Sequence, residues 1–140
     1  MKTLMLHVRS FEVEVVKLAT RPKGIKPEKL NDKNKKQVVK NAILCFICVE
    51  KGDFLEKNSK TLFSEIISFV NDVKHNNVVI FPFAHLSNKL ANYKEGIKFF
   101  DLLEKELKNK VNIFRSHFGS DKEWKVDVYG HIGAVRFREF

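Results

Sequence analysis

The sequence predicts an α/β fold in which helices flank a mixed β-sheet. Apolar and polar residues alternate near both ends of the chain, as in half-buried strands, and strand–helix–strand units fill the middle. Such units, in a sheet that also contains hairpins, combine parallel with antiparallel pairs and leave the helices as cover. The 140 residues, 44% of them hydrophobic, suit a single domain that spans residues 1–140.

The first third of the chain predicts an opening hairpin followed by a polar connection and a buried strand. Residues 4–8 and 11–16 alternate between apolar and polar types, with Arg9 and Ser10 as the turn between two strands. Residues 20–40 contain two of the three prolines and a basic run, so we expect an exposed loop or a short frayed helix. The unbroken apolar run 42–49 predicts a buried strand.

Two amphipathic helices alternate with strands in the middle of the chain. The first helix is predicted to start with Ser59 as its N-cap and to end near His75, because its apolar residues recur at spacings of three and four. Residues 78–81 predict a short strand buried on both faces, which Pro82 limits. A second apolar stripe predicts another helix over residues 93–108.

The C-terminal part predicts one more central strand and a closing hairpin. Residues 111–115 begin the strand, and residues 118–121 are expected to form a turn. Residues 123–129 and 132–137 alternate around Gly130, which predicts a final hairpin.

The charge of the chain favours a polyanionic partner. Lys and Arg total 26 against 17 Asp and Glu, a formal net charge of +9, and most of this excess must lie on the surface. A lysine-rich proteome would give the same balance without any such partner. The candidate RNA contacts, each equally explicable as part of a solvated face, are Lys33, Lys35, Lys36 and Lys125.

The two cysteines favour a structural role in a reducing cytoplasm. Cys45 and Cys48 have the spacing of a CxxC motif, but they lie in a predicted strand, where residues three apart point to opposite faces. No second CxxC or His pair stands nearby, so we expect neither a metal site nor redox chemistry. The N-terminus lacks a small-residue cleavage site, and no apolar segment approaches the roughly 20 residues of a membrane span. We therefore expect a cytoplasmic protein.

Two residues are candidates for chemistry. His85 follows a buried strand directly, at the position where α/β folds tend to place binding groups, although a lone histidine is often only structural. Lys122 comes three residues after Gly119 in a basic stretch, and it could equally be one more surface lysine.

Four blocks of the sequence resemble a known family. They are residues 4–7, residues 46–51, the block Phe81-Pro82-Phe83-Ala84-His85-Leu86-Ser87, and residues 118–122 followed by Lys125 and Gly130-His131. In this order along the chain they resemble the N-terminal editing domain of archaeal threonyl-tRNA synthetases, which is related in fold to D-aminoacyl-tRNA deacylases. The blocks span nearly the whole chain, so the resemblance implies a D-aminoacyl-tRNA deacylase-like fold.

The resemblance also implies an activity. Serine differs from threonine by one methyl group, worth only about 1–3 kcal/mol in a binding pocket, so serine attached in error to the threonine tRNA must be removed at a second site. The resemblance assigns catalysis to Lys122 and a pocket role to His85, with Val49 and Ala84 lining the aminoacyl pocket through their backbone. Phe83 and Asp121, their neighbours, are further substrate-binding candidates.

The implied reaction is hydrolysis of an aminoacyl ester without a metal or other cofactor. The family is thought to use the 2′-hydroxyl of the terminal adenosine, and the implied partners are tRNA, a synthetase core and a second copy of the chain. Two positions depart from the family pattern, since Asp121 stands where a tyrosine is usual and Val135 where a glutamate is usual. Two alternatives therefore stay open: a D-aminoacyl-tRNA deacylase and a catalytically inactive tRNA-binding module.

Overall fold

A computed structural model describes all 140 residues and is built on one six-stranded sheet. The strands follow the order β4-β3-β2-β1-β5, and β6 also pairs with β1. The β2–β3 and β3–β4 pairs are parallel and the pairs made by β1 are antiparallel, which confirms the expected mixed sheet. The strands are β1 (Lys2–Leu18), β2 (Lys36–Cys48), β3 (Asn77–Pro82), β4 (Asn112–Arg115), β5 (Ser120–Val128) and β6 (Val135–Glu139). The helices are α1 (Asp32–Lys35), α2 (Leu55–Val73), the 3-10 turn η1 (Ala84–Leu86) and α3 (Tyr93–Leu107).

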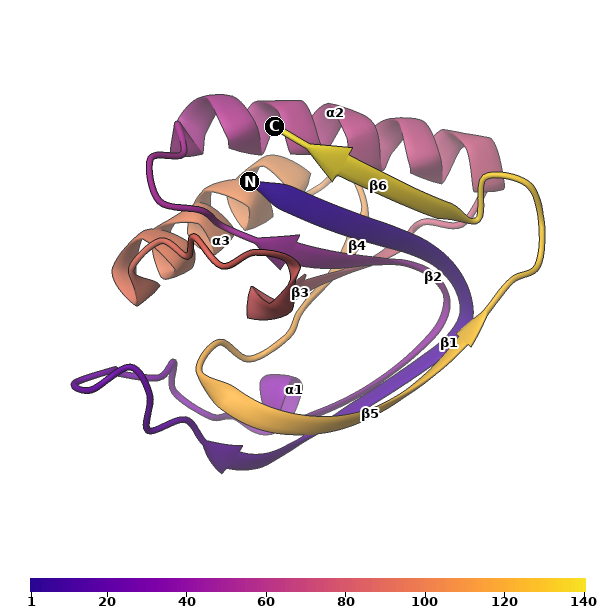
Figure 1. The fold of residues 1–140 in the computed structure, drawn as a ribbon. Helices are drawn as coiled ribbons and strands as arrows, with labels where there is room; N and C mark the ends of the chain where they lie inside the picture. The colour runs from indigo at the N-terminus through magenta and orange to yellow at the C-terminus, as the bar shows by residue number, and fades with distance from the viewer.

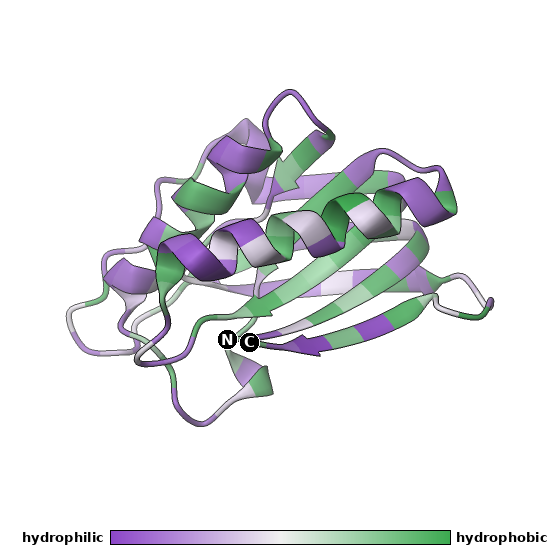
Figure 2. Cartoon of the chain, turned by 90° about the horizontal axis from the view of Figure 1, so that it is seen from above, coloured by the Kyte–Doolittle hydropathy of each residue, from purple (hydrophilic) through white to green (hydrophobic).

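Helices α2 and α3 lie together on one face of the sheet (Figure 1). The larger core cluster lies between them and the sheet and includes Cys45 of β2, Phe69 of α2 and Phe100 of α3. The strands beneath α2 are largely hydrophobic (Figure 2). A second cluster, with Phe46 of β2, lies on the opposite face, because successive strand residues point to opposite sides. No helix is long and apolar enough to cross a membrane.

The opening hairpin predicted from residues 4–16 is wrong. One long strand, β1, runs from Lys2 to Leu18, and both of its halves pair with β2 in antiparallel register. Arg9 and Ser10 instead lie where the register of β1 with β5 shifts, which is a bulge at which β1 bends (Figure 1). Alternation of apolar residues resumes after a bulge as it does after a turn, so the sequence pattern does not separate the two.

The closing hairpin is also wrong. Strands β5 and β6 do not pair with each other; β5 pairs with β1 from Val8 to Leu18, and β6 pairs with β1 from Lys2 to Leu6. The two strands therefore continue one another along the same edge of β1. The turn expected at residues 118–121 is shorter than predicted, because β5 already begins at Ser120.

Two element starts differ from the prediction, whereas the other central elements agree. Ser59 is not an N-cap: α2 begins at Leu55 after Phe54, and Ser59 is fully buried within the helix. Strand β2 begins at Lys36, directly after the short α1, and not at residue 42. Strand β3 and helix α3 confirm the predictions for residues 78–81 and 93–108, and α3 starts with an Asn92–Glu95 capping box.

Candidate active site

The chain leaves the sheet at the end of β3 and presents two exposed residues there. The Phe83 N–H still donates to the Ile47 carbonyl of β2 at 2.9 Å, and the next residues form η1. Ala84 and His85 are exposed, and the His85 ring meets the Phe83 ring edge-on at 5.1 Å between centroids. The carboxyl ends of parallel strands are where α/β sheets usually bind ligands. The histidine block is thus an accessible wall at that edge.

Lys122 lies on β5, opposite Val15 of β1. Its side chain is turned toward the sheet face that carries Phe81, with Nζ 5.3 Å from the ring centroid of Phe81. The Nζ group donates one hydrogen bond, to the Ser120 carbonyl at 3.2 Å. Burial lowers the pKa of Lys122 to about 8, although the nearby carboxylates of Asp121 and Glu28 act in the opposite direction. Lys122 is therefore not an ordinary surface lysine.

Four aromatic rings connect the Lys122 side of this face with the His85 side. Phe46 packs against Phe83 at 4.7 Å and against Trp124 at 5.4 Å between centroids, and Phe81 completes the group. Trp124 remains 44% exposed, so the cluster reaches the solvent at this ring. Trp124 was not predicted as a site residue. It lies two residues after Lys122 on a strand, and that spacing alone places both on one face.

The expected residue Asp121 does not join Lys122. Its carboxylate is exposed and lies 3.7 Å from the Lys17 ammonium on the other face of the sheet. Lys125, opposite Glu12 of β1, also lies on that outer face. The candidate RNA contacts Lys33 and Lys35 lie on α1, and Lys36 begins β2; all are exposed.

Two further positions that the family resemblance singled out, Val49 and Val135, do not present free groups beside Lys122 and His85. Val49 is buried in the helix-side core, and its carbonyl already accepts the Ala91 N–H at 3.1 Å. Val135 pairs with Leu6 and is exposed, whereas Lys122 lies beside the other half of β1. The structure thus gathers His85, Ala84, Phe83 and Lys122 around the aromatic cluster and leaves Val135 apart.

A buried histidine supports the backbone next to Lys122. His117 is 1% exposed, and its Nε2 lies 2.7 Å from the Glu28 carbonyl, so Nε2 must carry the proton that it donates. Its Nδ1 then accepts the hydroxyl proton of Ser120 at 2.7 Å. Ser120 is held in this way, and its carbonyl is the one that receives the Lys122 ammonium. Nothing in the sequence signalled this arrangement.

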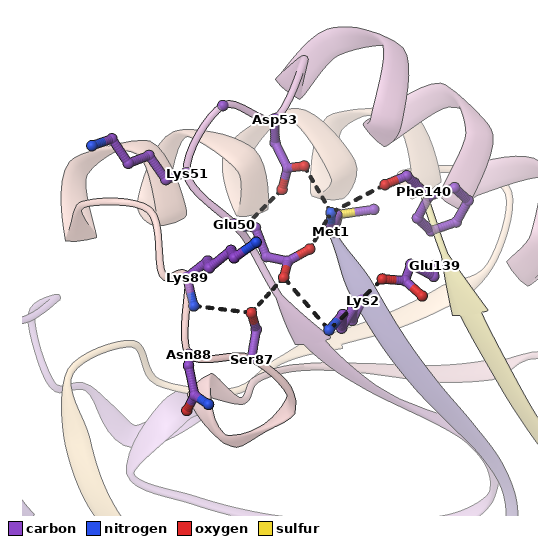
Figure 3. A pocket seen from close by; sticks show the side chains of 11 residues that line it. Met1, Lys2, Glu50, Lys51, Asp53, Ser87, Asn88, Lys89, Glu139 and Phe140 are labelled. Carbon is purple, nitrogen blue, oxygen red and sulfur yellow. Dashed lines mark hydrogen bonds and ion pairs between the residues drawn. The ribbon is translucent and has the colours of Figure 1, made fainter.

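A polar hollow of about 400 Å³ lies nearby but contains neither Lys122 nor His85 (Figure 3). The Met1 ammonium points into it and contacts Asp53 at 2.7 Å and Glu50 at 2.9 Å. Ser87 also donates a hydrogen bond to Glu50. This bond lowers the pKa of Glu50 most, and the hydrogen bond from the Met1 ammonium lowers it further. Because the polar groups already satisfy one another, we regard this hollow as structural.

The two cysteines are free, and both are buried. Cys45 packs in the helix-side core, whereas Cys48 faces the other way and its Sγ donates to the Ala84 carbonyl at 3.7 Å. Burial raises the pKa of the Cys45 thiol and keeps it protonated. Their positions match the opposite faces expected of residues three apart on a strand.

Comparison with known proteins agrees with the sequence blocks. In Saccharolobus solfataricus, the threonine–tRNA ligase editing subunit is 39% identical over 128 residues, which cover 91% of this chain and 31% of that protein. The threonine–tRNA ligase of Staphylothermus marinus is 35% identical over 133 residues, or 94% of this chain and 21% of the ligase. The chain thus spans about a fifth to a third of the length of these relatives.

One solved structure shows the same fold at low sequence identity. The c-Myc DNA unwinding element binding protein superposes with a TM-score of 0.71 over 100% of this chain and 99% of its own, at 12% identity. The family described as the archaea-specific editing domain of threonyl-tRNA synthetase matches residues 1–140. This chain therefore belongs to the archaea-specific editing domains of threonyl-tRNA synthetase.

Proposed function

We propose that this domain hydrolyses the ester bond of L-seryl-tRNA that carries the threonine anticodon. The family supports an editing role, and the small difference between serine and threonine explains why a second site is needed. The observation that carries the proposal is Lys122, a desolvated amine beside an aromatic cluster that is open to solvent. We further propose that the domain acts beside a threonyl-tRNA synthetase core, either fused to it or as a separate subunit.

Lys122 has the chemistry that ester hydrolysis requires. A charged amine has three N–H donors, and only one of them is used, toward Ser120. The others are available to the ester carbonyl or to the ribose, where they would stabilise negative charge as it develops. With a pKa of about 8, about a tenth of the Lys122 amines are neutral at pH 7, compared with about 0.03% at an ordinary pKa of 10.5. The same group can therefore also accept a proton from water.

The surroundings of Lys122 suit the end of a tRNA. Trp124 and Phe83 offer aromatic surface on which the terminal adenine can stack, an interaction worth about 1–3 kcal/mol. Ala84 and His85 border the same surface and would contact the aminoacyl group. The neutral Lys122 amine takes a proton from water as the water oxygen adds to the ester carbonyl. The bond to the ribose oxygen then breaks, and that oxygen takes the proton from Lys122, which releases serine and restores the neutral amine, while the neighbouring 2′-hydroxyl can hydrogen-bond the departing oxygen.

Comparing three substrates tests the proposal. L-seryl-tRNA, L-threonyl-tRNA and a D-aminoacyl-tRNA are each incubated with the protein, and the rate of ester loss is measured under single-turnover conditions. We expect rapid loss of the seryl ester only. Preference for the D-aminoacyl ester would replace the proposal with a D-aminoacyl-tRNA deacylase, and a seryl rate equal to the spontaneous one would leave an inactive tRNA-binding module.

Two lysine variants of the same strand separate chemistry from charge. Lys122→Ala should lower the single-turnover rate about 100-fold or more, the usual order of magnitude when a proton-transfer or donor group is lost. Lys125→Ala removes the same charge from the outer face of β5 and should leave the rate within about threefold. Equal losses in both variants would contradict a catalytic role for Lys122.

A further inference from the structure

We propose that residues 20–36, the connection between β1 and β2 together with the first residue of β2, form a phosphate-binding arm that holds the acceptor stem of the tRNA beside Lys122. This inference rests on the proposed function. The basic arm, as we call these residues, contains seven Lys and Arg against two acidic residues, a net charge of +5 out of +9 for the whole chain. Its cations are Arg21, Lys23, Lys26, Lys29, Lys33, Lys35 and Lys36.

None of these seven cations is neutralised within the protein. All are exposed, and none lies within 4.0 Å of a carboxylate. Elsewhere Arg9, Arg136 and Arg138 each pair with an acidic side chain. An exposed set of unpaired cations produces a positive potential that attracts a polyanion.

The acidic residue in the middle of the basic arm does not offset this charge, because it is turned inward. Glu28 accepts a hydrogen bond from the Arg115 guanidinium at 2.7 Å and from the Phe118 N–H at 2.9 Å. Glu28 is thus part of the attachment of the arm to the domain. Asp32 is the only acidic side chain that the arm leaves exposed.

The basic arm is fixed to the segment that leads into Lys122. The Glu28 N–H donates to the Phe118 carbonyl at 3.1 Å, and the Ala19 N–H donates to the Gly119 carbonyl at 2.9 Å. A Cβ on Gly119 would lie 3.0 Å from the Pro27 Cα, so the two backbones are in close contact. Figure 1 shows the arm extending beside the start of β5. The middle of the arm, at Pro27 and Glu28, is therefore anchored next to the start of the strand that carries Lys122.

A nucleic-acid backbone matches this surface better than an acidic protein does. The proposed substrate is an ester at the 3′ end of an RNA, so the adjoining stem must lie close to Lys122 when the ester does. Several Lys and Arg along one anchored segment suit regularly spaced phosphates and position a nucleic acid without reading its sequence. The arm thus supplies binding and orientation, and the aromatic cluster and Lys122 act on the terminal nucleotide.

A pair of triple variants tests the inference. The arm variant carries Lys23→Gln, Lys26→Gln and Lys29→Gln. The control carries Lys98→Gln, Lys105→Gln and Lys108→Gln, which remove the same charge from exposed, unpaired lysines in and directly after α3, in the helical layer. Binding of uncharged threonine tRNA to the full chain is measured over a range of salt concentrations.

The arm variant should bind tRNA at least 10-fold more weakly at about 100 mM salt, and the slope of log affinity against log salt should fall by about 2.7, or about 0.9 for each of three lost phosphate contacts. The control should change affinity less than threefold. Hydrolysis of seryl-adenosine, which lacks the stem, should be the same in the arm variant as in the unchanged protein.

The results separate this inference from the proposed function. Equal loss of tRNA affinity in the arm and control variants, or an unchanged salt slope, would overturn the phosphate-binding arm even if seryl-tRNA is hydrolysed. Arm-dependent tRNA binding without any ester hydrolysis would support the arm and overturn the deacylase. Slower hydrolysis of seryl-adenosine by the arm variant would also count against the arm, because it would mean that the substitutions disturb Lys122.

Discussion

Replacing Lys122 by methionine should make the protein more stable and inactive at the same time. A pKa of about 8 in place of 10.5 means that keeping the ammonium in the folded protein costs about 3 kcal/mol at pH 7, at 1.36 kcal/mol for each pH unit. Methionine is about as long and flexible as lysine but carries no charge, so it can occupy the site without this cost. Loss of the bond to Ser120 offsets part of the gain. We expect a net stabilisation of about 1–3 kcal/mol.

The pH dependence of this difference gives a sharper measurement than its size. The unfolded lysine keeps its proton up to about pH 10.5, whereas the folded one releases it near pH 8, so between these values the unfolded state binds more protons. The unchanged protein therefore gains stability from Lys122 as pH rises through this window, and Lys122→Met does not. The difference in unfolding free energy between Lys122→Met and the unchanged protein should shrink to less than about 1 kcal/mol at pH 10.

Urea unfolding of the two proteins at pH 7 and pH 10 measures this difference, and seryl-tRNA hydrolysis measures the loss of activity. Lys125→Met is the control, because the outer face of β5 should give a small and pH-independent change. A difference between Lys122→Met and the unchanged protein that is the same at both pH values would refute the argument. Active-site residues often reduce the stability of the folded protein, so replacing them can stabilise the protein while activity is lost.

Two further predictions concern the support of the site and a histidine cluster. Gly119→Ala should destabilise the protein by about 1–3 kcal/mol in urea unfolding, because Gly119 has φ +90° and a Cβ would press on Pro27, whereas Gly130→Ala, with open space around it, should stay within about 0.5 kcal/mol; equal effects would contradict the close contact. Burial, assisted by His75 and His131, lowers the pKa of His7 to about 4, and its ring nitrogens lie 2.7 Å from His131 and 2.8 Å from His75. An unfolded histidine binds its proton near pH 6.5, so acidification from pH 6.5 to 4 should reduce stability, and an NMR titration of His7 should show a midpoint near 4; a midpoint near 6.5 would rule out this contribution.

Local pattern predicted the elements better than their pairing. The apolar stripe of α3 and the buried run of β3 are visible in the sequence, since each depends on residues a few positions apart. That β1 is one continuous strand, and that β5 and β6 each pair with β1 and not with each other, depends instead on which strands become neighbours in the sheet. Alternation records only which face a residue occupies, so it is the same in a hairpin and in two strands that share a neighbour.

The candidate site divides in the same way. Strand alternation alone separates Lys122 from Asp121, and the residue block around His85 indicated the family and predicted a pocket wall. The lowered pKa of Lys122 and its support by Ser120, His117 and Glu28 required the tertiary structure. Desolvation and hydrogen bonds between residues almost ninety positions apart depend on how the chain packs, which no local spacing records.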